Sequence, residues 1–128
     1  MKRVLVCEDE LVIREFVVIN LKRAGYDVVD TDCGEAALRA YSDANGNFDI
    51  AVLDIMMPGI DGLEVCKQLR AQSAELGIIL LTAKAQQEDR QHGMDSGADM
   101  YVTKPFSPSV LTTQVNKLYA LIHKKNEG

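Results

Sequence analysis

Five strand-like runs alternate with five helical stretches along this 128-residue chain, and this alternation restricts its fold more than any other feature. The runs at residues 4–7, 50–53 and 78–81 are apolar throughout, which is typical of parallel strands buried on both faces. Parallel neighbours need long crossover connections, which are usually helices. The alternation therefore predicts one α/β domain in which helices cover both faces of a parallel sheet.

The predicted elements follow one another without a repeat, a linker or a low-complexity segment. We predict strands at residues 3–8, 27–31, 50–53, 78–82 and 99–103. We predict helices at residues 10–24, 34–41, 62–72, 86–96 and 107–123. The flavodoxin-like strand order 2-1-3-4-5 is a common solution at this size, so we expect a (βα)5 domain over residues 1–125. Residues 126–128 lie beyond the helical pattern, as a linker or a cloning remnant.

The apolar residues of the first and last helices predict which side of each helix meets the sheet. In the first helix, residues at helical spacing should face the sheet: Ile13, Phe16, Val17, Leu21 and Ala24. Three further apolar residues are surplus to that stripe and hint at a contact surface: Leu11, Val12 and Val18. In the last helix the residues in register are Val110, Leu111, Val115, Leu118 and Ile122.

The composition argues against several classes of protein. The net charge is -5 and no basic stripe is present, so direct nucleic-acid binding by this domain is not expected. No apolar stretch is long enough to predict a membrane span or a signal peptide. Cys7, Cys33 and Cys66 are odd in number and lack a C-x-x-C spacing. We therefore expect buried, reduced cysteines in a cytoplasmic protein.

Polar residues follow the apolar runs where four of the predicted strands end. They are Glu8 and Asp9 after the first strand, Asp54 after the third, Thr82 in the fourth and Lys104 after the fifth. Because the carboxyl ends of parallel strands lie at one edge of a sheet, these side chains should meet there. The site then holds three carboxylates, one hydroxyl and one ammonium group.

Three carboxylates at close range repel one another and require cations to offset their charge. Oxygen-rich clusters of this kind select a hard divalent ion, typically Mg²⁺. A metal and a lysine beside a strand-end aspartate are suited to phosphoryl transfer, because both stabilise the charge of the transferring group. On this reading the nucleophile is Asp54.

Several motifs occur together in one order and spacing: Glu8-Asp9, Asp54 with Met56-Met57-Pro58-Gly59-x-Asp61-Gly62, Thr82-Ala83, Gly97-Ala98-Asp99, and Tyr101-x-x-Lys104-Pro105. Each motif alone is weak, but the set is highly specific. From Val4 to about Lys125 the chain resembles the receiver domain of bacterial two-component response regulators.

The resemblance implies a phosphorylation-dependent signalling switch and not an enzyme with an external product. Asp54 would accept a phosphoryl group from a histidine kinase or a histidine phosphotransfer protein. Mg²⁺ (or Mn²⁺) would be held by Glu8, Asp9, Asp54 and the backbone carbonyl of Met56. The switch would then pass a conformational change to an output domain or partner.

The resemblance also assigns roles on the last two strands. Thr82 would bond one phosphoryl oxygen and Lys104 another. Tyr101 would swing inward when Thr82 moves. The bond between Lys104 and Pro105 would be cis, which proline tolerates more readily than other residues.

Two positions tune the lifetime of the phosphoryl group in this family, and here they are Met56 and Lys84. An apolar methionine and a long lysine would crowd the attacking water, so we predict dephosphorylation over minutes to hours.

The run from Tyr101 to Pro108 resembles the subfamily whose receivers precede a winged-helix DNA-binding domain. Those receivers pair through charged residues on the fourth helix, fifth strand and fifth helix. Arg90 and Asp99 fit that pattern, but Met100 replaces an acidic residue and residues 112–114 lack the usual charges. A homodimer on phosphorylation is therefore possible, with its mode open. The surplus apolar residues of the first helix would instead serve kinase docking.

Other interpretations compete with this one. Each polar residue has a structural alternative: a helix cap, a turn former, a strand threonine, a solvated lysine or a packing tyrosine. A haloacid-dehalogenase-type phosphatase needs a second aspartate where Met56 stands, and a flavodoxin-like redox carrier needs a phosphate loop where residues 8–10 are acidic. A receiver-like scaffold that is never phosphorylated is the third alternative, and the complete set of site residues argues against it.

Overall fold

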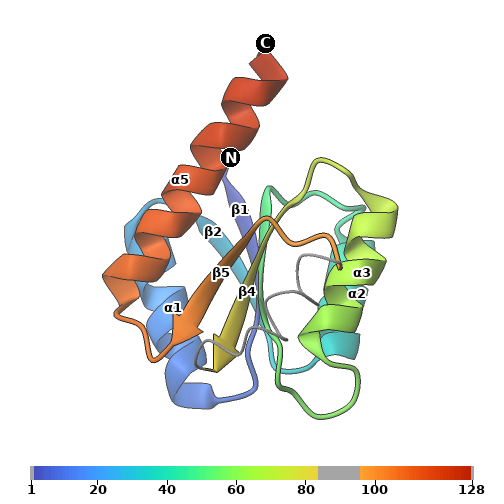
Figure 1. Ribbon diagram of the computed structural model, residues 1–128, viewed down its shortest axis with the longest axis vertical. Coiled ribbons are helices and arrows are strands. Elements are labelled where there is room, and N and C mark those ends of the chain that lie inside the picture. The colour runs from blue at the N-terminus through green and yellow to red at the C-terminus, as the bar shows by residue number, and fades with distance from the viewer. Residues whose placement is uncertain (1, 84–95, 128) are drawn as a thin grey trace.

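The computed structural model describes residues 2–83 and 96–127 of the chain (Figure 1). Its strands are β1 (Arg3–Cys7), β2 (Asp27–Thr31), β3 (Ile50–Asp54), β4 (Gly77–Ala83) and β5 (Met100–Lys104). The helices of the described ranges are α1 (Leu11–Arg23), α2 (Gly34–Asp43), α3 (Gly62–Gln72) and α5 (Pro108–Glu127). The helix predicted at residues 86–96 lies outside the described residues except for Ser96, which is in a turn.

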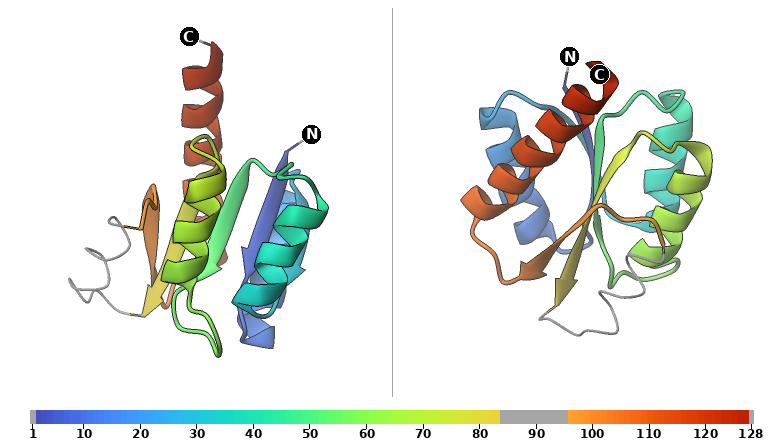
Figure 2. Two further views of the ribbon diagram at one scale, coloured as in Figure 1. Left: turned by 90° about the vertical axis from the view of Figure 1, so that its right-hand side faces the viewer. Right: turned by 45° about the horizontal axis from the view of Figure 1, so that its top comes forward.

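The strands form one parallel sheet in the order β2-β1-β3-β4-β5, which confirms the predicted flavodoxin-like topology. Helices α1 and α5 cover one face of this sheet, and α2 and α3 cover the other (Figure 2). The order in which strands are added reverses between β1 and β3, since β2 lies on one side of β1 and β3 to β5 lie on the other. Ligands bind at such a switch point, outside the carboxyl ends of the strands.

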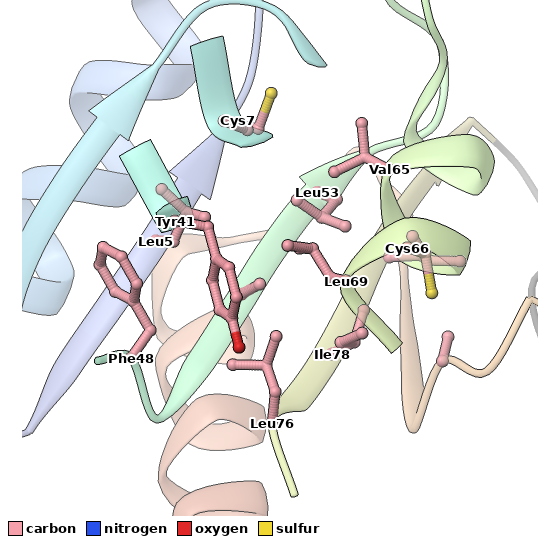
Figure 3. Close-up of a cluster of buried hydrophobic side chains, with 14 of the residues drawn as sticks. Leu5, Cys7, Tyr41, Phe48, Leu53, Val65, Cys66, Leu69, Leu76 and Ile78 are labelled. Atoms are coloured by element: carbon pink, nitrogen blue, oxygen red, sulfur yellow. The ribbon is translucent and has the colours of Figure 1, made fainter. Parts of the chain in front are cut away.

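The core consists of two layers that the sheet separates. Alternate residues of β3 enter different layers: Ala51 and Leu53 pack toward α2 and α3, whereas Ile50 and Val52 pack toward α1 and α5. Figure 3 shows the first layer, in which Leu53 lies beside Leu69 of α3. Burial on both faces explains why the central strands are apolar at every position and not only at alternate ones.

The face of α1 differs from the prediction at one residue. Val17 and Leu21 are buried, and Ile13 packs against the core, but Phe16 is 56% exposed. Phe16 precedes Val17 by one position, which rotates it by about 100° around the helix. Two of the three surplus residues, Leu11 and Val12, are exposed as the sequence hinted; Val18 is partly buried against the core instead.

Helix α5 is longer than predicted, and one residue of its predicted buried face is exposed. It runs from Pro108 to Glu127, so the prediction that residues 126 and 127 lie beyond the helix is wrong. Val110 is exposed, since it lies one position away from the buried Leu111. In Figure 1 the second half of this helix projects past the sheet. All three cysteines are free; Cys7 and Cys66 are buried and Cys33 is partly buried.

Candidate functional site

The predicted site residues of β1, β3, β4 and β5 come together at the carboxyl edge of the sheet. Glu8 and Asp9 follow β1, whose last residue Cys7 pairs with Leu53 of β3. Asp54 is the last residue of β3, and Lys104, the last residue of β5, pairs with Ala83 at the end of β4. In Figure 1 this edge is at the lower end of the arrows.

Lys104 joins the two buried carboxylates of the site. Its Nζ lies 2.8 Å from Glu8 Oε1 and 3.1 Å from Asp54 Oδ2. Glu8 is 0% exposed and Asp54 3% exposed, so both carboxylates depend on protein groups and not on bulk water for their stabilisation. Glu8 Oε2 also accepts a hydrogen bond from the Glu10 amide at 3.1 Å.

The charges at the site are not balanced by Lys104 alone. Burial is the main cause that raises the pKa of the Glu8 carboxyl from 4.5 to about 7. The hydrogen bond with Lys104 lowers this pKa, and the neighbouring Asp54 raises it further. Burial lowers the pKa of Lys104, but its hydrogen bonds to Glu8 and Asp54 outweigh burial and raise that pKa overall. Burial and the neighbouring Asp54 therefore favour protonation of Glu8, and a further cation would favour its charged form.

The donor set fits a hard divalent cation. Glu8, Asp9 and Asp54 each offer a carboxylate oxygen, and these oxygens all lie within 4.8 Å of one another. Asp9 is the most solvent-accessible of the three, which leaves room for the waters that Mg²⁺ retains. The Met56 amide donates to Asp54 Oδ1 at 3.3 Å, which ties the start of the following loop to the Asp54 side chain.

The loop between β3 and α3 is fixed at both ends. Asp61 caps α3, with its Oδ1 accepting from the Glu64 amide at 2.9 Å. The Gly62 amide donates to the Ile55 carbonyl at 3.0 Å. A Cβ on Gly62 would collide with the Asp54 backbone carbonyl, so only glycine allows this close approach.

The proposed switch residues lie on the neighbouring strands. Thr82 is 1% exposed, and its Oγ1 donates a long hydrogen bond of 3.5 Å to the Ala83 carbonyl. Tyr101 is partly buried and packs against the layer formed with α2 and α3. The Lys104–Pro105 bond is cis, as predicted. Lys84 and Arg90 lie outside the described residues.

Sequence reasoning missed two features beside the site. The first is an apolar hollow of about 630 Å³ between α1 and the start of α5, lined by Ile13, Phe16, Val17, Ala83, Lys104, Pro105, Phe106 and Pro108. None of the surplus apolar residues of α1 lines it; the α1 residues that do were assigned to the sheet-facing stripe, and the contribution of Phe106 and Pro108 was not visible either. The second is Arg14, which contacts the loop of Glu8 and has no counterpart among the recognised motifs.

Comparison with known proteins identifies the family. The response regulator receiver domain family matches residues 4–116. The chain belongs to this family. The receiver domain is 44% identical over 117 residues to the alkaline phosphatase synthesis transcriptional regulatory protein PhoP of Bacillus subtilis, covering 91% of this chain and 48% of PhoP. The chain thus spans about half the length of the curated relatives it matches.

Solved structures agree with this receiver-domain assignment. The chemotaxis protein CheY4 of Vibrio cholerae is 33% identical with a TM-score of 0.86, covering 92% of this chain and 98% of that one. The BeF3-activated DrrB receiver domain is 32% identical with a TM-score of 0.81, covering 92% and 97%. Among the helices of the described ranges, none is both long enough and apolar enough to cross a membrane.

Proposed function

We propose that Asp54 is the phosphoacceptor of this receiver domain and that its donor is a phosphohistidine of a sensor kinase or a histidine phosphotransfer protein. The observation that carries the proposal is the pair of contacts from Lys104 Nζ, 2.8 Å to Glu8 and 3.1 Å to Asp54, at the carboxyl edge of the sheet. A strand-end carboxylate held by an ammonium group, beside two further carboxylates, combines a nucleophile with the charges that phosphoryl transfer requires.

In the transfer, one Asp54 oxygen forms a bond to phosphorus while the bond between phosphorus and the donor histidine nitrogen breaks. The electron pair of the broken bond returns to the imidazole. Mg²⁺ (or Mn²⁺), when bound, neutralises charge on the transferring group. Glu8, Asp9, Asp54 and the Met56 carbonyl are the groups that would hold it. Lys104 supplies a second positive charge, positioned before the phosphoryl group arrives.

Phosphorylation would change what Thr82 and Lys104 contact. An aspartyl phosphate adds charge and acceptor oxygens at Asp54, as phosphorylation of other side chains does. Lys104 would exchange its carboxylate partner for a phosphoryl oxygen. The buried Thr82 hydroxyl would give up its long hydrogen bond of 3.5 Å to the Ala83 carbonyl and donate to another phosphoryl oxygen instead. Tyr101, on the strand beside Thr82, would follow that movement and alter the surface of β5 and α5.

The kinase would dock on the exposed apolar side of α1. Leu11, Val12, Phe16 and Ile19 are all exposed there. The hollow next to them fits an apolar side chain from a partner helix, because its lining is nearly all hydrophobic. Lys104 lines this hollow and also contacts Asp54, so a helix seated in it would carry a phosphohistidine toward the acceptor.

We infer slow loss of the phosphoryl group, over minutes to hours. The Met56 side chain is 69% exposed at the mouth of the site and offers no group that would activate water. Lys84, the second position that tunes this lifetime, is equally unsuited to act as a base while charged. A phosphoryl half-life of seconds in purified protein with Mg²⁺ would contradict this inference.

The output is proposed from the relatives. PhoP is a transcriptional regulatory protein about twice the length of this chain. A transcriptional effector domain of winged-helix type, joined to this receiver in the whole protein, is the corresponding proposal here. The cytoplasm is the compartment we propose, because the free cysteines suit a reducing environment. Dimerisation on phosphorylation is part of the proposal, without a defined interface.

The test compares wild type with Asp54→Asn during incubation with Mg²⁺ and acetyl phosphate or beryllofluoride. We expect wild type to gain one phosphoryl group by intact mass and to show a bound fluoride species by fluorine NMR, and Asp54→Asn to show neither. Asp43→Asn is the matched control, since Asp43 is an exposed carboxylate at the far end of α2. Modification that persists in Asp54→Asn, or that fails in wild type, would refute the proposal.

A further inference from the structure

Arg14 lies in the first turn of α1, after the loop of Glu8 and Asp9 (the acidic loop), and its side chain reaches back to that loop. Its Nη1 donates to the Glu8 backbone carbonyl at 2.9 Å, and its Nε lies 3.4 Å from Asp30 Oδ2 of β2. The Arg14 side chain is only 17% exposed. An arginine near a helix N-terminus gains nothing from the helix dipole, so these contacts and not helix stability account for its placement.

The contact matters because of the peptide group on which it acts. The Glu8 carbonyl belongs to the planar peptide group that joins Glu8 to Asp9. The direction of this carbonyl therefore fixes the orientation of the Asp9 amide and of the backbone that carries the Asp9 side chain. On the other side of Glu8, its amide donates to the Thr31 carbonyl at 3.1 Å. The backbone of Glu8 is therefore held by β2 on one side and by Arg14 on the other. Arg14 is itself held by Asp30.

We propose that Arg14 is a positioning residue for the metal site: by holding the Glu8 carbonyl it aims the Glu8 and Asp9 carboxylates at Asp54. The inference rests on the proposed function, because it needs Glu8, Asp9 and Asp54 to bind Mg²⁺. Arg14 contacts neither the metal nor the phosphoryl group in this role. Removing residues that orient metal ligands typically weakens metal binding by about 10–100-fold.

Electrostatics alone makes the opposite prediction, which allows a decisive test. Arg14 is a positive charge near a cation site, so its removal would strengthen Mg²⁺ binding if charge were its only effect. If Arg14 orients the loop, its removal weakens Mg²⁺ binding. Arg14→Lys separates the two further, since it preserves the charge but cannot hold the Glu8 carbonyl and Asp30 together as a guanidinium does.

The experiment measures Mg²⁺ affinity by NMR titration of wild type, Arg14→Met, Arg14→Lys and the control Lys22→Met. Lys22 is exposed near the other end of α1, so its replacement removes one charge from the same helix without touching the loop. We expect Arg14→Met to bind Mg²⁺ about tenfold or more weakly, Arg14→Lys to lie between it and wild type, and Lys22→Met to match wild type. Without metal, amide hydrogen exchange at Glu10 should be faster in both Arg14 variants than in Lys22→Met.

Each result decides the matter. Wild-type or tighter Mg²⁺ binding by Arg14→Lys, or by a folded Arg14→Met, overturns the inference while leaving the proposed function intact. Should circular dichroism show that Arg14→Met is unfolded, Arg14→Lys alone decides. If wild type itself fails to bind Mg²⁺, or binds it as well as Asp54→Asn does, the proposed function fails and the role of Arg14 fails with it.

Discussion

Replacing Glu8 with glutamine tests the charge imbalance of the site directly. Glu8 is fully buried between Lys104 and Asp54, and its pKa is raised from 4.5 to about 7. A group whose pKa is higher in the folded state favours folding when protonated. Its contribution is complete below the unfolded pKa and is lost as the pH rises through the folded pKa. Glutamine copies the protonated form and removes this loss.

The rise in pKa sets the size of the effect. At about 1.4 kcal/mol for each pH unit, a pKa that moves from 4.5 to about 7 corresponds to about 3 kcal/mol of folding free energy. Wild type should lose that amount, relative to Glu8→Gln, between acidic pH and pH 8. We therefore expect the stability of Glu8→Gln to rise by about 2–3 kcal/mol relative to that of wild type between pH 5 and pH 8.

The assay is urea unfolding followed by circular dichroism in EDTA, from pH 5 to pH 8. Glu75→Gln is the control, because Glu75 is exposed away from the site, and its stability should follow that of wild type at every pH. Adding Mg²⁺ should stabilise wild type at pH 8 and have little effect on Glu8→Gln, since a ligand stabilises only the form that binds it. A Glu8→Gln protein that loses stability relative to wild type between pH 5 and pH 8 would show that the ion pair with Lys104 outweighs burial, and would refute this reasoning.

Three further predictions concern other parts of the molecule. Arg70 donates to the carbonyls of Ser73, Ala74, Leu76 and Gly97 and to the Asp99 carboxylate. Arg70→Met should therefore lower the free energy of unfolding by about 2–4 kcal/mol, as measured in urea; an equal loss in the exposed control Arg39→Met would contradict the role of these bonds. Gly62→Ala should cost about 1–3 kcal/mol and abolish labelling by acetyl phosphate, because its Cβ meets the Asp54 backbone; unchanged labelling would show that the loop can move. Phe16→Ala combined with Phe106→Ala should slow transfer from a sensor kinase about tenfold, with transfer from acetyl phosphate unchanged. Leu121→Ala, on exposed α5 surface, is its control, and equal slowing with both donors would place the defect at Asp54 instead of at the docking surface.

The sheet and the gathering of the site residues were predictable because both follow from simple rules. Central parallel strands are apolar at every position, so β3 and β4 were visible as runs without alternation. Parallel strands also end at the same edge of a sheet, so the topology alone predicts that Glu8, Asp54 and Lys104 lie close together. The metal ligands and the roles of Thr82 and Tyr101 stay predictions.

The residues that were placed wrongly lie on helices with more apolar surface than the core can cover. Phe16 and Val110 each stand beside a buried residue, and a single position turns a side chain by about 100°. Arg14 and Arg70 could not be assigned from sequence for another reason. Their partners are mostly backbone carbonyls, and a carbonyl carries no signature in the amino-acid sequence.

The strand order places the groups expected to move on phosphorylation on one side of Asp54 and the groups that hold the acidic residues after β1 on the other. The groups expected to follow the phosphoryl group, Thr82 and Lys104, lie on β4 and β5, on one side of Asp54. On the other side, β2 holds the Glu8 amide through the Thr31 carbonyl, and its Asp30 pairs with Arg14, which holds the Glu8 carbonyl. Phosphorylation should therefore change the structure on one side of Asp54 only. Amide hydrogen exchange should change in β4, β5 and α5 and stay constant in β2 and α2.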